Sequence, residues 1–284
     1  MATSTYSPAR LGLRRRLTSL GMALRESPAA SASGRPTLLY IHGLGESAYC
    51  FEDLLVAPRL ADYRQLAPDL LNYGKSLWAP EPLDLEGHAV ALLRLLDEQE
   101  IDWVVLVGHS MGGVIGLRLG QLLGPRLAGF VNIEGNVSLA DCTFSSQVAG
   151  LPLADWLSSG QGAFLERLYA GTCLPPAPER DAAVVLRAYA ASIHMADPRA
   201  YHRNSGDLVA ISRQETIPAE LAALGKPLIY VYGAPRGTQQ HSRKLLAHAG
   251  IELREIAPAG HWPFLDQPAA FLDVVTDFLD ALAP

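Results

Sequence analysis

The segment Gly-His-Ser-Met-Gly-Gly at positions 108–113 constrains the fold of this chain more than any other feature. It directly follows the apolar, β-branched run 103–107, which is typical of a buried strand, and it precedes residues 114–123, whose pattern indicates a helix. Between a strand and a helix, G-x-S-x-G forms a sharp, strained turn that lifts the serine hydroxyl above the sheet. Glycines are needed there because side chains would collide with the strand and the helix. The sequence therefore predicts that Ser110 is a nucleophile on a nucleophile elbow.

Length and composition agree with a large α/β protein. The chain has 284 residues, of which 49% are hydrophobic and 18% charged, so it can bury a substantial core and is neither disordered nor a coiled coil. The net charge of −6 disfavours nucleic acid as a partner, and the only basic cluster, at 14–16, is expected on a solvated strand edge. No apolar run is typical of a signal peptide or a membrane span, and the three cysteines lack C-x-x-C spacing. We expect a soluble, cytoplasmic protein that binds neither membranes nor nucleic acid.

Predicted strands alternate with predicted helices along most of the chain. An opening hairpin is expected within 12–27. Further strands are expected at 37–41, 63–67, 103–107, 128–133, 227–232 and 251–256. Helices are expected at 51–60, 85–99, 114–123, 238–249 and 268–283. This alternation predicts a mostly parallel central sheet with helices on both faces.

The alternation stops between Asn136 and Glu220, where several short helices and a proline-rich interruption at 173–178 are expected. A long insertion at the carboxyl edge of a parallel sheet lies where active sites are built. We therefore predict a core formed by 1–135 and 217–284, and a helical cap formed by 136–216.

A serine hydroxyl is a weak nucleophile until a base accepts its proton. His261 is the candidate base, because it follows the last predicted strand and a loop at 257–260, and it comes last in a Ser…acid…His chain order. His42 and His109 are expected to have structural roles in their turns. The remaining five histidines lack a strand-end context: His88, His194, His202, His241 and His248.

Acyl transfer also needs two backbone N–H groups that stabilise the developing oxyanion. One is expected from Met111, the residue after the nucleophile. The other is expected from Leu44, which lies between two glycines in the loop after the first central strand. Leu44 and Met111 are therefore the predicted oxyanion hole.

Four segments carry a resemblance to a known family. They are H-G-L-G at 42–45, D-L-L-N-Y-G-K-S at 69–76, G-H-S-M-G-G at 108–113 and G-H-W-P-F-L-D-Q-P at 260–268. In these segments and their order the chain resembles the α/β-hydrolase superfamily over nearly its whole length except the cap. The resemblance implies the α/β-hydrolase fold and its catalytic machinery, and says little about the substrate.

The chain departs from the commoner family pattern at the catalytic acid. Many members have an aspartate in the loop after the penultimate strand, but here that loop is Gly-Ala-Pro-Arg-Gly at 233–237. In members such as haloalkane dehalogenases and zearalenone lactonases, the acid follows the strand after the elbow helix, which corresponds to Glu134. The resemblance thus implies a triad of Ser110, Glu134 and His261. The serine excludes the aspartate-nucleophile chemistry of dehalogenases and epoxide hydrolases.

The sequence predicts a serine hydrolase that cleaves a carboxylic ester, including a lactone, of a small hydrophobic substrate through an acyl-enzyme on Ser110. No clustered metal-ligand spacing or dinucleotide fingerprint is present, so no metal or cofactor is expected. A thioesterase or acyltransferase on the same triad is the main alternative, followed by a carbon–carbon bond hydrolase and a non-catalytic ligand receptor. The candidates for substrate binding are Trp156, Tyr169, Tyr189 and Trp262.

Overall fold

The computed structural model describes residues 12–27, 34–171 and 182–282, in which eight strands form one sheet in the order β1-β2-β4-β3-β5-β6-β7-β8. The strands are β1 (Arg14–Leu17), β2 (Ala23–Glu26), β3 (Thr37–Ile41), β4 (Gln65–Pro68), β5 (Val104–His109), β6 (Leu127–Ile133), β7 (Leu228–Pro235) and β8 (Glu252–Ala259). Strands β3 to β8 pair in parallel, whereas β2 is antiparallel to both β1 and β4. The predicted α/β fold, its mostly parallel sheet and its opening hairpin are confirmed, and the exposed arginines 14–16 lie on the edge strand.

The α-helices of the described residues are α1 (Glu52–Leu55), α2 (Leu85–Glu98), α3 (Met111–Leu123), α4 (Ser145–Ala149), α5 (Leu153–Asp155), α6 (Gln161–Tyr169), α7 (Ala182–Ile193), α8 (Pro198–Ser212), α9 (Ile217–Ala223), α10 (Gln240–His248), α11 (Pro263–Asp266) and α12 (Pro268–Ala281). None of the helices in this part of the chain is long and apolar enough to cross a membrane. Of the three cysteines, Cys50 and Cys142 are free thiols, and Cys173 lies outside the described residues.

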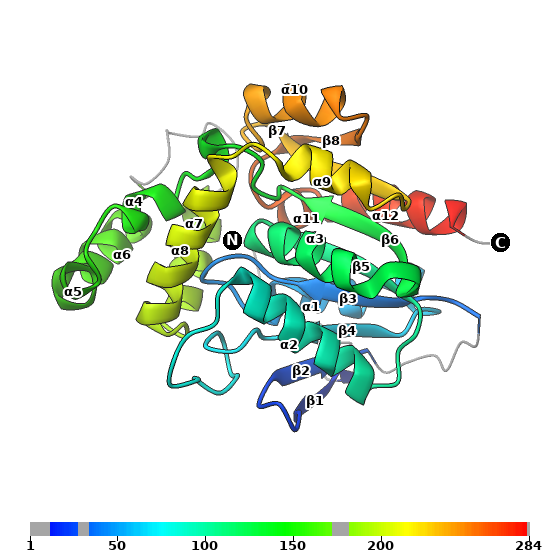
Figure 1. The fold of residues 1–284 in the computed structure, drawn as a ribbon, viewed down its shortest axis with the longest axis horizontal. Helices are drawn as coiled ribbons and strands as arrows, with labels where there is room; N and C mark the ends of the chain where they lie inside the picture. Colours follow the sequence, from blue (N-terminus) through cyan, green and yellow to red (C-terminus); the bar gives the residue numbers. More distant parts are fainter. Residues whose placement is uncertain (1–11, 28–33, 172–181, 283–284) are drawn as a thin grey trace.

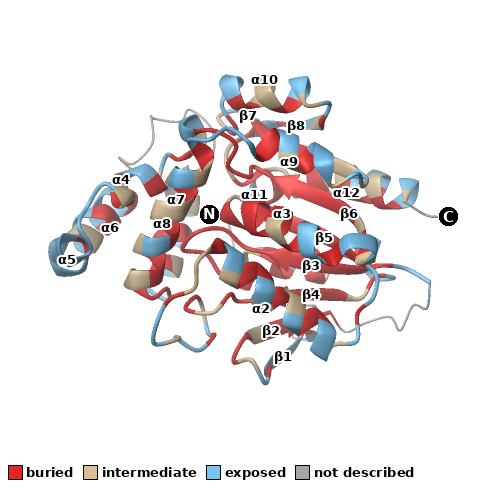
Figure 2. Ribbon diagram, in the orientation of Figure 1, coloured by how far each residue is buried: buried red, intermediate tan, exposed pale blue. Residues whose placement is uncertain are grey.

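Helices cover both faces of the sheet (Figure 1). Successive residues of a strand point to opposite faces. On β6, the Phe130 ring lies against Gly116 of α3, whereas Gly129 lies against Phe278 of α12, so α3 and α12 pack on opposite faces. Figure 2 shows that the central strands are buried almost throughout, while the outward surfaces of the helices are exposed.

Three predicted elements differ from the structure. The loop predicted at 233–237 is wrong up to Pro235, because β7 continues to pair with β8 as far as that residue. The helix predicted at 51–60 is three short pieces, because Ala57 precedes Pro58 and takes an extended conformation (ψ 124°) that ends the turn. The sequence predicts a loop at 257–260, and this prediction is wrong for 257–259. These residues belong to β8, whose last residue, Ala259, pairs with Pro235 of β7. An edge strand such as β8 tolerates Pro258, whose missing N–H does not interrupt a ladder on both sides.

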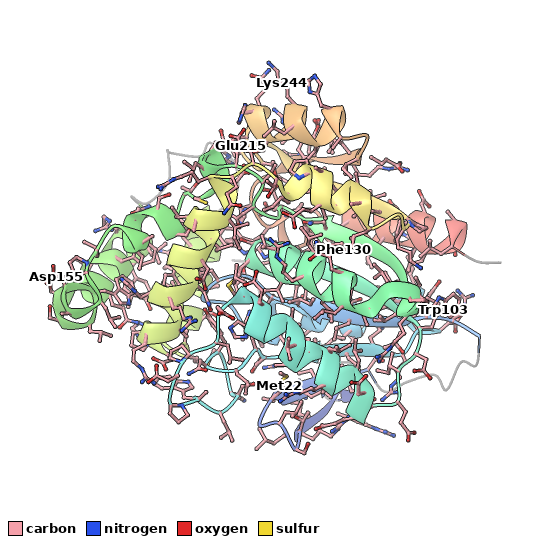
Figure 3. The ribbon with its side chains drawn as sticks, viewed as in Figure 1. Met22, Trp103, Phe130, Asp155, Glu215 and Lys244 are labelled. Atoms are coloured by element: carbon pink, nitrogen blue, oxygen red, sulfur yellow. The ribbon has the colours of Figure 1, made fainter. Side chains whose placement is uncertain are left out.

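Helices α4 to α8 follow β6 and lie together at the carboxyl end of the parallel strands (Figure 1). In Figure 3, Trp103 marks the residue before β5, and Asp155 in α5 lies at the opposite end of the molecule. We keep the name "cap" for residues 136–216, whose boundaries stay a prediction. This placement sets the cap helices beside the ends of β5, β6, β7 and β8.

Buried polar side chains anchor the cap helix α8 to the core. Asn204 of α8 accepts a hydrogen bond from the Tyr73 hydroxyl at 2.7 Å and lies 3.3 Å from Nε2 of His88 in α2. Its amide nitrogen donates to the Leu83 carbonyl at 2.9 Å. Because these groups are buried, their bonds fix α8 against the core below it.

The buried imidazole of His88 makes stability depend on pH. Burial lowers the pKa of His88 to about 4. Between pH 6.5 and 4 the unfolded chain binds a proton at this residue and the folded chain does not, so stability is lost as the pH falls through this window. A pKa shift of this size lowers the free energy of unfolding at pH 4 by about 3 kcal/mol.

We expect a His88→Gln variant to lose correspondingly less free energy of unfolding between pH 7 and pH 4, measured by urea denaturation. The control is His248→Gln, which removes an exposed imidazole; equal pH dependence in the two variants would contradict this expectation.

Candidate active site

Ser110 occupies the turn between β5 and α3, with a positive φ of 52° and ψ of −119°. Such a conformation is strained for a residue other than glycine. The Ser110 N–H donates to the Ile133 carbonyl at 2.9 Å, and the Gly113 N–H donates to the Ser110 carbonyl at 2.8 Å. A Cβ at Gly112 would lie 2.0 Å from the Ile41 carbonyl oxygen. The structure therefore contains the strained turn, and the steric need for glycine, that the sequence predicts.

Glu134 directly follows β6, the neighbour of β5, so it leaves the sheet at the same edge as the elbow. The carboxylate is buried, and its Oε2 lies 3.3 Å from Nδ1 of His261. Its Oε1 accepts hydrogen bonds from the backbone N–H groups of Gly233 at 2.7 Å and Thr238 at 3.1 Å. A Cβ at Gly237 would lie only 2.0 Å from Oε1. The end of β7 and the loop after it, residues 233–238, thus have no acid of their own and instead bind the acid that follows β6.

His261 follows β8, and its side chain is 23% exposed. Because Nδ1 faces a carboxylate, this nitrogen carries the hydrogen, and Nε2 is left to accept a proton. The backbone carbonyl of His261 accepts a hydrogen bond from Nε2 of His109 at 2.8 Å. Since His109 immediately precedes Ser110, this bond sets the candidate base beside the candidate nucleophile. The structure thus brings Ser110, Glu134 and His261 to one edge of the sheet; their catalytic roles stay predictions.

The loop after β3 lies against the elbow. A Cβ on Gly43 would be 3.1 Å from the Ser110 Cβ, so this backbone passes directly over the nucleophile. Buried His42 orders the loop, because its Nε2 accepts a hydrogen bond from the Leu70 N–H at 3.0 Å and its Nδ1 donates to the Gly43 carbonyl at 2.9 Å. Burial lowers the pKa of His42, which keeps the ring neutral for this pattern. The next residue is Leu44, the predicted oxyanion donor.

Met111, the other predicted oxyanion donor, is the first residue of α3. The first N–H groups of a helix have no partner within the helix and carry a partial positive charge. This placement is compatible with an oxyanion hole between the β3 loop and the start of α3. The roles of Leu44 and Met111 stay predictions.

Sequence analysis missed Glu46, a buried carboxylate at the centre of the site. Its Oε2 accepts hydrogen bonds from the Gly43 N–H at 2.7 Å and from His109 Nδ1 at 3.0 Å, and its Oε1 accepts one from Trp262 Nε1 at 2.6 Å. Burial alone would raise the pKa of Glu46, but the charge of His109 and these hydrogen bonds lower it to about 2. Burial would lower the pKa of His109, and the Glu46 charge outweighs it and raises that pKa. Glu46 lies 63 residues from His109 and 216 from Trp262, so no local pattern reveals the cluster.

Aromatic rings of the cap lie beside the candidate base. The half-buried Phe144 ring is 6.5 Å from the His261 ring and 6.2 Å from the Trp262 ring. Tyr189 of α7 lies 5.2 Å from Phe144 and 5.6 Å from Trp262, and its hydroxyl bonds the Tyr201 hydroxyl at 2.9 Å. Two predicted substrate-binding residues, Tyr189 and Trp262, thus lie near His261. Sequence analysis did not select Phe144, which is the N-cap of the short helix α4.

The other two predicted substrate-binding residues lie elsewhere in the cap. Trp156 is fully buried, its ring stacks on Tyr201 at 5.6 Å, and its Nε1 donates to the Pro198 carbonyl at 2.8 Å. Tyr169 is 42% exposed and stacks on His194 at 6.3 Å. These contacts are those of a cap core residue and a cap surface residue, and substrate contact by either one stays a prediction.

Within the described residues, no group of three or more His, Cys, Asp or Glu side chains is arranged to hold a metal ion.

Comparisons with known proteins agree with the fold. Residues 38–274 match a family described as the alpha/beta hydrolase family. The chain is 27% identical over 262 residues to 2-succinyl-6-hydroxy-2,4-cyclohexadiene-1-carboxylate synthase of Serratia proteamaculans. The aligned region covers 86% of this chain and 93% of that protein.

Solved structures resemble this one over almost the whole chain. A putative aryl esterase from Burkholderia cenocepacia superposes with a TM-score of 0.70 at 24% identity, covering 95% of this chain and 98% of that one. A mutant of the N-acyl homoserine lactonase AidH, complexed with N-hexanoyl homoserine, gives a TM-score of 0.69 at 22% identity, covering 95% of this chain and 96% of that one. At these identities the likeness shows the shared fold.

Proposed function

Because this chain belongs to the alpha/beta hydrolase family, we propose that it hydrolyses carboxylic esters, including lactones, through an acyl-enzyme on Ser110. In the first step, His261 Nε2 takes the proton of the Ser110 hydroxyl as its Oγ attacks the acyl carbonyl. The backbone N–H groups of Leu44 and Met111 stabilise the negative charge on the carbonyl oxygen. The Glu134 carboxylate stabilises the imidazolium that forms.

The second half of the reaction uses the same groups in reverse. His261 gives its proton to the leaving alcohol oxygen, and the carbon–oxygen bond of the ester breaks. His261 then takes a proton from a water molecule that attacks the acyl-enzyme, and the acid is released from Ser110. The proton returns to the serine oxygen, so the enzyme is regenerated.

One observation carries this proposal: buried Glu134 is directed by two backbone N–H groups at Nδ1 of His261, beside a serine on a strained elbow. This carboxylate keeps the hydrogen of His261 on Nδ1 and leaves Nε2 to accept a proton, as a general base requires. The names of the two structural neighbours, a putative aryl esterase and an N-acyl homoserine lactonase, add support for ester and lactone substrates.

The similarity to a synthase over most of both chains favours a second candidate. The name of that relative describes the formation of a ring compound that carries a carboxylate, so the second candidate is synthase chemistry on such a compound. The rings that contact His261 are those of His109, Trp262 and Phe144, and His109 lies behind the elbow, bound to Glu46. On the cap side, the apolar Phe144 and Trp262 rings suit an uncharged acyl group better than a carboxylate, and we therefore rank the ester hydrolase first.

The test is turnover by the purified wild-type chain of p-nitrophenyl esters from acetate to octanoate, N-acyl homoserine lactones and acyl thioesters. The proposal predicts saturable hydrolysis of the esters or lactones, with release of the free acid. Faster thioester than ester hydrolysis would favour the thioesterase alternative. Absence of hydrolysis of all three classes above the buffer rate would contradict the proposal.

The rings beside His261 should determine substrate ranking. We expect Phe144→Ala to change the relative kcat/KM of short and long acyl esters by about 1–3 kcal/mol, because it removes an apolar ring beside the base and opens space for a longer acyl chain. The control is Leu157→Ala, an apolar cap residue that is 45% exposed, and it should keep the wild-type ranking. An equal loss for all esters in Phe144→Ala, with the ranking unchanged, would contradict a role in specificity.

A further inference from the structure

A single buried side chain, Glu46, contacts the immediate neighbours of three positions of the proposed machinery. It binds the N–H of Gly43, the residue before the predicted oxyanion donor. It binds His109, the residue before the nucleophile, and Trp262, the residue after the base. These three partners and the Cys50 thiol, whose Sγ lies 3.8 Å from Oε2, donate hydrogen bonds to the carboxylate, which is 5% exposed. The loop after β3, the end of β5 and the segment after β8 therefore meet at one anion.

His109 extends this cluster to the base itself. Its Nδ1 faces the Glu46 carboxylate at 3.0 Å, and its Nε2 faces the backbone carbonyl oxygen of His261 at 2.8 Å. Both partners can only accept hydrogen bonds, so both ring nitrogens must carry hydrogen and the ring is an imidazolium. The ring is fully buried and its centroid is 4.9 Å from that of His261. A buried cation and a buried anion thus neutralise each other directly behind the elbow.

We propose that Glu46 and His109 are positioning residues for the proposed hydrolase, holding the main chain of His261 and the Gly43 loop at a fixed distance from Ser110. This inference rests on the proposed function. Ser110 is fixed by a strand and a helix, but His261 and Gly43 lie on loops, whose backbones need other anchors. Charge-assisted hydrogen bonds are directional as well as strong, and apolar packing would not fix a carbonyl oxygen and an indole N–H.

The charge is needed because of the donors that converge on Glu46. In a Glu46→Gln variant, the single amide oxygen can accept hydrogen bonds either from Gly43 and His109 or from Trp262. In either orientation the amide NH₂ faces the N–H donor on the other side and cannot accept its hydrogen bond. One contact of the cluster is therefore lost even though the shape is kept. Without the negative charge of Glu46, His109 is no longer stabilised as an imidazolium. A neutral ring has one N–H group and can donate to only one of its two partners, residue 46 or the His261 carbonyl.

The experiment compares Glu46→Gln with Glu52→Gln in ester hydrolysis. Glu52 is a matched control because it is also a buried carboxylate in ion pairs, but its partners are Arg25 of β2 at 2.9 Å and Arg15 of β1 at 3.0 Å. We expect kcat to fall by about 10²-fold in Glu46→Gln, as misplacement of a catalytic group by about 1 Å can cost, with a much smaller change in KM. Glu52→Gln should keep the wild-type kcat even if its melting temperature falls as much as that of Glu46→Gln.

Two further readouts separate positioning from a general loss of stability. In a cycle with His109→Gln, the double variant should be no slower than the slower single variant, because both changes break one unit. In ¹⁵N spectra of histidine-labelled protein at pH 8, one histidine should carry hydrogen on both nitrogens in the wild type, disappear in His109→Gln and become neutral in Glu46→Gln.

The outcomes distinguish this inference from the proposed function. An inactive wild type would contradict the proposed function. The ¹⁵N spectra would then still test whether Glu46 keeps His109 protonated, since that measurement does not depend on activity. An active wild type with equal kcat in Glu46→Gln and Glu52→Gln would overturn the positioning role. A neutral His109 in the wild-type spectra, or additive losses in the double variant, would also overturn it.

Discussion

Ser110→Ala should lower kcat for p-nitrophenyl esters to the background rate, a loss of about 10⁶-fold of the kind seen when a catalytic serine is removed. Alanine cannot form the acyl-enzyme, and neither His261 nor the oxyanion loop can replace the missing oxygen. The fold should persist, because serine and alanine are similarly strained at a φ of 52°, and the change removes only one hydroxyl. The free energy of unfolding should therefore stay within about 1 kcal/mol of the wild type.

Two measurements check this expectation: initial rates with an activated ester, and the urea midpoint of the same preparation. Native stability together with lost turnover supports the assignment. Ester hydrolysis at more than a trace of the wild-type rate by folded Ser110→Ala would remove Ser110 from the mechanism.

Glu134→Gln should lower kcat by about 10⁴-fold, the cost of replacing the carboxylate that orients a catalytic histidine by an amide. The amide oxygen can still accept from Gly233 and Thr238, so its NH₂ group faces Nδ1 of His261 and donates to it. The ring is then held as the tautomer with hydrogen on Nε2. In that form His261 cannot take the proton of Ser110.

The chain offers a matched control for this variant. Glu215 also has a positive φ, of 53°, and also pairs with a histidine, His241, at 2.9 Å, but both side chains are exposed. Glu215→Gln should keep the wild-type kcat. Near-wild-type kcat in Glu134→Gln, or equal losses in the two variants, would contradict the assignment of Glu134 as the acid.

The sequence predicts those parts of the fold and site that depend on neighbouring residues. A strand, a glycine-flanked serine and a helix are contiguous at 103–123, so the elbow could be predicted without a structure. Glu134 could be named because the loop at 233–237 has no carboxylate and the family resemblance offers a second place for the acid. The structure adds why that loop matters: Gly233 and Thr238 bind the acid through backbone N–H groups.

The parts that could not be predicted depend on contacts between distant segments. Glu46 appears in sequence as one charged residue after a glycine-rich loop, and its partners are known only once β3, β5 and β8 are aligned. The same holds for aromatic residues of the cap. Trp156 and Tyr189 look equivalent in sequence, but Trp156 packs within the cap and Tyr189 packs beside Trp262.

Reaction with a fluorophosphonate, followed by mass spectrometry of the intact chain and its peptides, tests the central claim most directly. A phosphonylated serine forms only where a base activates the hydroxyl and an oxyanion hole accepts the phosphonyl oxygen. Our account predicts a single adduct on Ser110 in the wild type, strongly slowed labelling in Glu134→Gln, and none in Ser110→Ala. A folded wild-type chain that remains unlabelled, or that carries the adduct on another residue, would contradict it.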